Sequence, residues 1–113
     1  MDAGNLPTRR LDHDGLNTGC GSLDIDHCFD GWDGQLQLSE GGLRMTVSSD
    51  LDCLVVYTQP GRNSMAIEPV SHVNNALALA RQRGQSPASL GIRVLQPGDS
   101  FAARMRIQVE QLA

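Results

Sequence analysis

The stretch QLQLSEGGLRMTVS, residues 35–48, decides the fold that we expect for this chain. Its first part, Gln35–Leu38, alternates polar and apolar residues as a half-buried strand does, and Leu43–Ser48 alternates again. Between the two parts stands Gly41-Gly42, a pair typical of a tight turn between antiparallel strands. The stretch therefore predicts a β-hairpin.

Other short runs that follow the hairpin also predict strands. They are Leu54–Thr58, Met65–Glu68, Gly91–Leu95 and Phe101–Val109. The last is the clearest, because its apolar residues all share one face while arginine and glutamine occupy the other. Pro69 is expected to stop the run that precedes it.

Turns and one helix complete the prediction. The sequences of Asp50–Asp52 and Gln96–Asp99 are typical of turns. The spacing of Ala and Leu in residues 74–83 predicts a short helix that ends at Gly84. Strands spaced about 8–12 residues apart are typical of an all-β antiparallel sandwich. We expect such a sandwich, or part of one, with one short helical segment.

Length and composition limit what the chain can be. Its 113 residues correspond to a single domain, 1–113, in which residues 1–22 are predicted to be mostly extended loop. No apolar run approaches the roughly 20 residues that span a bilayer, and the first residues do not resemble a secretory signal. We therefore expect no membrane association.

Charge and cysteine content narrow the class further. The net charge is −4, and the nine basic residues, all arginine, are scattered, which disfavours nucleic-acid binding. The three cysteines are an odd number without a C-x-x-C pair, which favours a reduced, cytoplasmic protein. Cys53 lies in an apolar run and is interpreted as a buried small hydrophobic residue.

The acidic segment 23–34, LDIDHCFDGWDG, is a candidate metal site by composition. A calcium loop that starts at Asp24 would put Cys28 and Phe29 where a ligand and a glycine are required. His27, Cys28 and His72 have no zinc-ligand spacing. We predict no metal and interpret the segment as a polar turn that leads into a strand.

A second candidate segment surrounds Glu68, which follows three apolar residues. A carboxylate at a strand end beside buried surface would be desolvated, and this would make Glu68 a better base near neutral pH. The alternative is an exposed glutamate at a strand terminus. Ser71 and His72 are sequence neighbours without a G-x-S-x-G motif, so a serine hydrolase is disfavoured.

Several segments, in order along nearly the whole chain, resemble motifs of the aldose 1-epimerases (galactose mutarotases). DHCF at 26–29 resembles D-H-x-F, and AIEP at 66–69, followed by NAL at 75–77, is similar to the E-P segment and its downstream D/N-A. LQPGD at 95–99 resembles L-x-P-G-E, LVVYT at 54–58 resembles L-Q-V-Y-T, and LPT at 6–8 resembles L-P-T-G, with Arg9 in place of the glycine.

The resemblance implies a large antiparallel β-sandwich that binds a free aldohexose and interconverts its α and β anomers without a cofactor. By motif, Glu68 is the base that takes the proton from the C1 hydroxyl, and Asp26 accepts a hydrogen bond from a sugar hydroxyl. Trp32, just after the Asp26 motif, either stacks on the sugar or packs in the core.

The chain departs from the family in length, because it resembles only the C-terminal third of its members. The family's general acid is missing, and His13, His27 and His72 match no role. Pro69 after the glutamate puts the sugar preference in question. A carbohydrate-binding module without turnover, or an inactive fragment, is the alternative. Cut strand edges lead us to expect self-association or cover by upstream chain.

Overall fold

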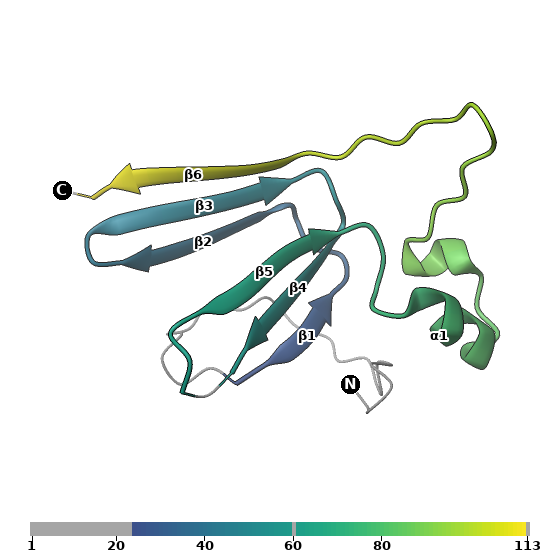
Figure 1. The fold of residues 1–113 in the computed structure, drawn as a ribbon, viewed down its shortest axis with the longest axis horizontal. Coiled ribbons are helices and arrows are strands. Elements are labelled where there is room, and N and C mark those ends of the chain that lie inside the picture. Colours follow the sequence, from purple (N-terminus) through teal and green to yellow (C-terminus); the bar gives the residue numbers. More distant parts are fainter. Residues whose placement is uncertain (1–23, 60, 113) are drawn as a thin grey trace.

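The computed structural model describes residues 24–59 and 61–112, and these residues build two small antiparallel sheets (Figure 1). The elements are β1 (Asp26–Phe29), β2 (Gln35–Glu40), β3 (Leu43–Ser49), β4 (Cys53–Thr58), β5 (Met65–Val70), α1 (Ala76–Arg83), the 3₁₀ turn η1 (Pro87–Leu90) and β6 (Met105–Gln111). Sheet A has the strand order β1-β4-β5, and sheet B has the order β2-β3-β6. The predicted all-β class with one short helix is confirmed. The expected loop 1–22 lies outside the described residues, as do LPT at 6–8, His13 and Cys20.

The predicted hairpin is present as β2 and β3, with Glu40 paired to Leu43 across a two-residue loop. Gly41 and Gly42 in that loop have φ angles of 57° and 80°. Positive φ at both central residues matches the right-handed twist of a hairpin and favours glycine at both places. Local sequence therefore sets the start of sheet B.

The central strand of sheet A, β4, is apolar on both faces. Its first four residues are all buried: Cys53, Leu54, Val55 and Val56. A strand with neighbours on both edges and cover on both faces is expected to be a continuous apolar run rather than an alternating one. This burial makes β4 the main contributor to the core.

The prediction for the segment 23–34 was wrong in part, since Asp26–Phe29 is strand β1 and not a polar turn. It pairs with β4, and Cys28 lies opposite Val55. A buried central strand needs hydrogen-bond partners along both edges, and this tertiary requirement overrides the polar composition of β1. The turn follows the strand, at residues 30–34.

Pro69 does not stop β5, which continues to Val70, so that prediction was also wrong. Pro69 lies opposite Leu54 on the outer strand of sheet A. Proline lacks an N–H donor but is tolerated in an edge strand, because only one side of the strand has a neighbour to bond.

The predicted helix is confirmed as α1, and its stop at Gly84 is also confirmed. Gly84 adopts a left-handed conformation with φ 63°, and its N–H donates to the carbonyl of Ala80. Ala76 and Leu79 pack with Cys53 and Val73 in a buried cluster. The helix therefore covers one end of sheet A, where β4 begins and β5 ends (Figure 1).

The segment between η1 and β6 is an extended arm. The strand predicted at Gly91–Leu95 is absent, because no described strand lies beside this segment to bond with it. The predicted turn Gln96–Asp99 is confirmed: Gly98 has φ 92°, and the Asp99 N–H donates to the Gln96 carbonyl over 2.9 Å.

Strand β6 begins at Met105, four residues later than predicted. Just before it, two side chains at the end of β3 replace the sheet hydrogen bonds of Arg104. The Ser49 hydroxyl donates to the Arg104 carbonyl, and the Arg104 N–H donates to Asp50 Oδ1 at 2.9 Å. The alternating pattern therefore predicted an extended backbone correctly but placed the start of the strand too early.

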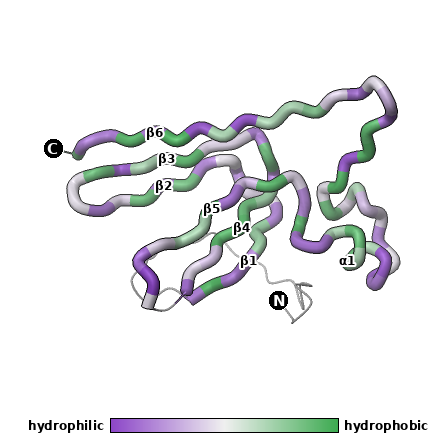
Figure 2. Tube along the Cα trace, viewed as in Figure 1, coloured by the Kyte–Doolittle hydropathy of each residue, from purple (hydrophilic) through white to green (hydrophobic). Residues whose placement is uncertain are grey.

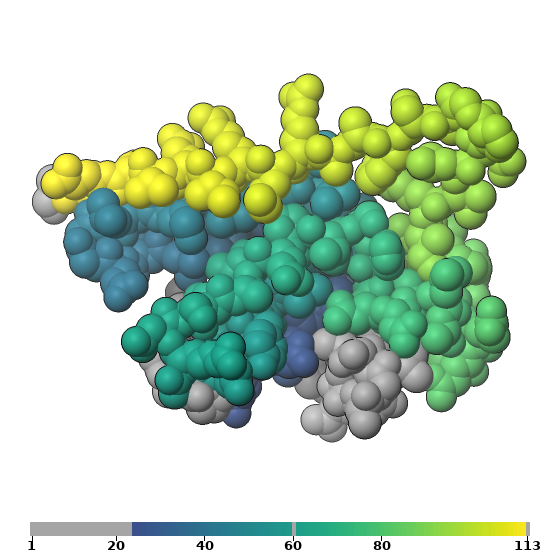
Figure 3. Space-filling model, in the orientation of Figure 1, coloured from purple at the N-terminus to yellow at the C-terminus, as the bar shows by residue number. Residues whose placement is uncertain are grey.

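The two sheets lie close together at one end and spread apart at the other (Figure 1). The Cα radius of gyration is 15.9 Å, against about 13 Å for a compact domain of this length. Apolar and polar residues alternate along the strands of sheet B (Figure 2). Strand β6, yellow in Figure 3, forms one border of the molecule.

Candidate functional site

Sheet A brings the two predicted carboxylates onto one face. Asp26 pairs with Tyr57, while Val55, two residues before Tyr57, pairs with Glu68. Residues that face each other across a ladder, and residues two apart in a strand, share a face of the sheet. Asp26, Tyr57 and Glu68 are therefore exposed residues on one face of sheet A, around buried Val55, and we call this face the Tyr57 face.

The strand order sets the distance across the Tyr57 face. Asp26 lies on β1 and Glu68 on β5, with β4 between them. Two strand spacings and one two-residue step separate their Cα atoms by about 12 Å. At this distance the two carboxylates do not interact directly, and a ligand placed over Tyr57 can reach both.

Glu68 is exposed and lies within β5, not at its end. The sequence suggested a carboxylate desolvated at a strand end, and the structure does not place it in such an environment. Asp26 is exposed as well. Both carboxylates are therefore in contact with solvent, and a base at either position would need further cover to be desolvated.

Tyr57 was missed in the sequence analysis. Its side chain is 40% exposed, although its neighbours in β4 on either side, Val56 and Thr58, are buried. A large exposed ring on an otherwise buried strand is unusual, and such rings often contact ligands. The signal was available in LVVYT, where alternation puts Tyr57 on the face of Val55.

Trp32 lies in the loop after β1 and is half-buried. Its indole N–H donates to the Gln35 carbonyl over 3.0 Å, and its backbone N–H donates to the Asp52 carbonyl over 3.0 Å. Both bonds hold the loop against the start of β2 and the connection before β4. These hydrogen bonds position the loop, and sugar stacking by Trp32 stays a prediction.

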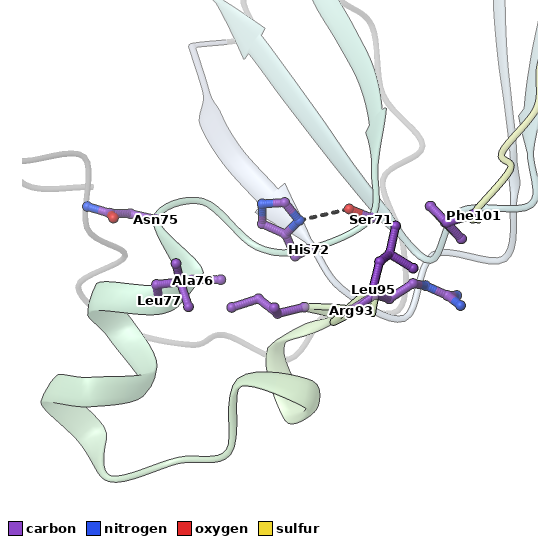
Figure 4. Close-up of a pocket in the computed structure, with 9 residues that line it drawn as sticks. Ser71, His72, Asn75, Ala76, Leu77, Arg93, Leu95 and Phe101 are labelled. Atoms are coloured by element: carbon purple, nitrogen blue, oxygen red, sulfur yellow. Dashed lines mark hydrogen bonds between the residues drawn. The ribbon is translucent and has the colours of Figure 1, made fainter. Parts of the chain in front are cut away.

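A second group of polar side chains lines an open hollow of about 420 Å³ between the end of β5, α1 and the arm (Figure 4). The Ser71 hydroxyl and His72 Nδ1 lie 2.8 Å apart, within hydrogen-bonding distance. At the other side of the hollow, the Arg93 guanidinium lies 4.4 Å from the centre of the Phe101 ring, a cation–π contact.

Gly91 allows the start of the arm to lie directly against the loop that forms one side of this hollow. It has φ 89°, and a Cβ at this position would lie 2.3 Å from the Ser71 carbonyl oxygen. The Val73 N–H donates to the Leu90 carbonyl over 3.1 Å. Only glycine permits so close an approach, so Gly91 lets the arm start against the loop that carries His72.

Two free thiols lie where α1 covers sheet A. Cys28 packs against buried Cys53. A hydrogen bond with Cys53, supported by a backbone N–H of Asn74, holds the pKa of Cys28 below its ordinary value. The same bond, together with burial, raises the pKa of Cys53. Cys28 is the more exposed of the two and the better nucleophile.

Metal binding has no support in the described part of the chain. Within residues 24–59 and 61–112, no three His, Cys, Asp or Glu side chains gather closely enough to hold an ion. This also holds for the three residues whose spacing the sequence analysis compared with a zinc site, His27, Cys28 and His72. The chemistry of the Tyr57 face is therefore that of carboxylates and an aromatic ring.

Comparisons of the chain with protein-family models, curated proteins and solved structures gave no match. The resemblance to aldose 1-epimerases therefore rests on the sequence motifs alone. Among the described helices, none is long and apolar enough to cross a membrane.

Proposed function

We propose that this chain binds a free aldose on the Tyr57 face and acts in anomer interconversion of the aldose 1-epimerase type. The observation that carries the proposal is the shared face of Asp26 and Glu68, with an exposed tyrosine ring between them. The two carboxylates belong to sequence motifs that lie 42 positions apart, and pairing with β4 brings them to the same face.

The chemistry of each residue follows from its type. A carboxylate accepts hydrogen bonds from hydroxyl groups, and sugars present many hydroxyls on a small ring. Tyr57 offers a flat apolar surface for the ring, and its own hydroxyl is 3.4 Å from Gln59 Oε1. Asp26 holds a ring hydroxyl, and Glu68 accepts the proton of the C1 hydroxyl.

Loss of the C1 hydroxyl proton opens the ring only if the ring oxygen gains a proton. The carbonyl forms at C1, C1–C2 rotates, and reclosure on the other face gives the second anomer. His27 neighbours Asp26 but points to the opposite face of β1 by strand alternation. His72 lies in the loop beyond β5 and is bonded to Ser71. The general acid is proposed to come from outside this chain.

A carbohydrate-binding module without turnover is the second candidate. The exposure of Glu68 favours it, because an exposed carboxylate can accept a hydrogen bond from a sugar hydroxyl without any proton transfer. In both cases we propose an aldohexose ligand and no cofactor. We also propose a reducing cytoplasmic setting, on the odd number of cysteines and the lack of a C-x-x-C pair in the sequence.

The test is a titration of the isotope-labelled chain with glucose or galactose, followed by NMR. We expect shift changes centred on Asp26, Tyr57 and Glu68, and their loss in Tyr57→Ala. Glu40→Gln, a change of an exposed glutamate on sheet B, is the matched control and should bind normally. No shift changes, or changes confined to the hollow near His72, would overturn the proposed site.

Polarimetry on freshly dissolved α-glucose at pH 7 separates the enzyme from the binding module. For this chain alone we expect the rate of the buffer, because the acid is missing. In a parent protein that supplies the acid, Glu68→Gln should lower the rate by about 10²–10⁴-fold. Acceleration by this chain alone that His72→Ala abolishes would instead identify His72 as the acid.

A further inference from the structure

Strand β6 has one bonded edge and one open edge. The Leu112 N–H donates to the Gly42 carbonyl, and Arg104 bonds to the side chains of Ser49 and Asp50. Because backbone direction alternates along a strand, the even-numbered residues of β6 face β3. The N–H and C=O groups of the odd-numbered residues, Met105 to Gln111, therefore point away from sheet B.

No described strand pairs with that outer edge. Met105, Ile107 and Val109 are each more than half exposed, and they share a face with Val47 of β3. An apolar strand with unpaired backbone groups on one side readily pairs with another strand. The sequence of β6 indicates which strand would pair with this edge.

The residue order of β6 is self-complementary. Its midpoint is Gln108, with Ile107 and Val109 on either side, and Arg106 and Glu110 one step further out. When a copy of β6 runs antiparallel with Gln108 opposite Gln108, each arginine faces the partner's glutamate. Each Ile107 then lies beside the partner's Val109.

We propose that the chain forms a symmetric dimer in which β6 pairs antiparallel with β6 of a second copy, with Gln108 on the two-fold axis. The two B sheets join into one continuous sheet with the order β2-β3-β6-β6-β3-β2. An interface of this kind uses the same surface on both copies and closes on itself.

Backbone geometry agrees with this register. In antiparallel pairing, residues whose backbone groups point across the gap must lie opposite one another. With Gln108 on the axis, Ile107 lies opposite the partner's Val109, and both are outward-facing positions. Met105 lies opposite the partner's Gln111, and these two are outward-facing as well. Every backbone group on the open edge from Met105 to Gln111 gains a partner.

Charge favours this register, because it pairs arginine with glutamate within β6 itself. Arg44 on β3 already lies 3.6 Å from Glu110. In the dimer the partner's Arg106 reaches the same glutamate from the other side, so each carboxylate lies between two guanidinium groups. A register centred on Ile107 would place Arg106 opposite the partner's Gln108, and Glu110 would then face the partner's Arg104, which lies before the start of β6. Opposite charges directly across strands stabilise a pairing, and like charges destabilise it.

Charge reversal followed by sedimentation velocity tests both the edge and the register. We expect the unmodified chain to be a dimer at ~100 μM, an arbitrary high concentration. Arg106→Glu and Glu110→Arg should each put like charges across both ends and weaken dimerisation by about tenfold or more at low salt. An equimolar mixture of the two variants should dimerise again, because every cross-strand pair is then attractive.

Two further variants serve as controls. Arg81→Glu, on the exposed side of α1, changes the net charge equally and should leave the dimer intact. Ile107→Pro removes an outward N–H that β3 does not use, and it should give a monomer whose circular dichroism is unchanged.

Three results would overturn the proposal. The first is a monomer at every concentration, which would mean that a second copy of β6 does not pair with the open edge of β6. The second is dimerisation of both single variants at the strength of the unmodified chain. The third is a mixture no better than its components.

Discussion

Sheets A and B use the same number of described strands in opposite ways. The central strand of sheet A is buried, and α1 covers one end of the sheet. Sheet B has one polar face and one apolar face, and all of β6 is exposed. A sheet that is buried within its own chain contributes stability by itself, whereas a sheet with an open apolar edge depends on a partner. The predictions below test this difference, starting with the largest effect.

The difference in packing predicts unequal costs of truncating an apolar side chain in each sheet. Leu54 on β4 is 3% exposed, and Ile107 on β6 is 55% exposed. We expect Leu54→Ala to lower the free energy of unfolding by about 2–5 kcal/mol. Ile107→Ala should change it by less than about 0.5 kcal/mol at concentrations too low for association. Urea denaturation of both variants measures this, and equal losses in dilute solution would contradict the comparison.

The polar surfaces of the two sheets should also differ in sugar binding. Asp26→Asn on the Tyr57 face removes a charged acceptor, and we expect it to weaken aldose binding by about 1.5–3 kcal/mol. The matched change Glu40→Gln on sheet B should have no effect on the dissociation constant. Calorimetric titration checks both variants. Unchanged affinity in Asp26→Asn would mean that Asp26 is only a strand residue.

Gly91 tests how firmly the arm is joined to sheet A. Alanine at this position would carry a strained positive φ and a Cβ that meets the Ser71 carbonyl. We expect Gly91→Ala to destabilise the fold by about 1–3 kcal/mol, measured by thermal unfolding. Gly98, also at positive φ but with open space around its Cβ position, is the control, and its alanine variant should lose less.

The thiols test the covered end of sheet A. Because the Cys28 pKa lies below its ordinary value of about 8.5, its thiolate favours the folded state. This contribution is complete above that value and is lost as the pH falls through the folded-state pKa. Iodoacetamide at pH 7 should therefore modify Cys28 before Cys53, and Cys53→Ala should slow the reaction. Mass spectrometry of the peptides gives the order, and faster modification of Cys53 would contradict it.

Sequence predicted the parts of the fold that local rules control. The Gly41-Gly42 turn, the end of α1 at Gly84 and the Gln96–Asp99 turn each depend on residues close together in the chain. Strand β1 and the start of β6 depend on partners far away in sequence, and there the predictions were wrong. Alternation at 91–95 had no neighbouring strand to bond, and so it produced only extended backbone.

The candidate site also contains features that local sequence predicts and features that depend on distant partners. Glu68 and Asp26 were selected by type and motif, but their common face depends on the register of β1 and β5 against β4, which no local pattern contains. Tyr57 was missed for the same reason, since its exposure follows from what fails to cover β4. The Cys28–Cys53 contact likewise needs a diagonal pairing between two strands.

The hydrogen bond between Ser49 and Arg104 joins residues that are 55 positions apart in the sequence. The β2–β3 hairpin, in contrast, closes over only two glycines. Closing a long loop costs more chain entropy, and hairpins form within microseconds. We therefore expect β2 and β3 to assemble early and β6 to dock later in folding. Until it docks, one edge of β3 remains open to other chains. The separation of 55 positions between Ser49 and Arg104 thus sets a kinetic interval in which aggregation competes with folding, and a shorter separation would narrow that interval.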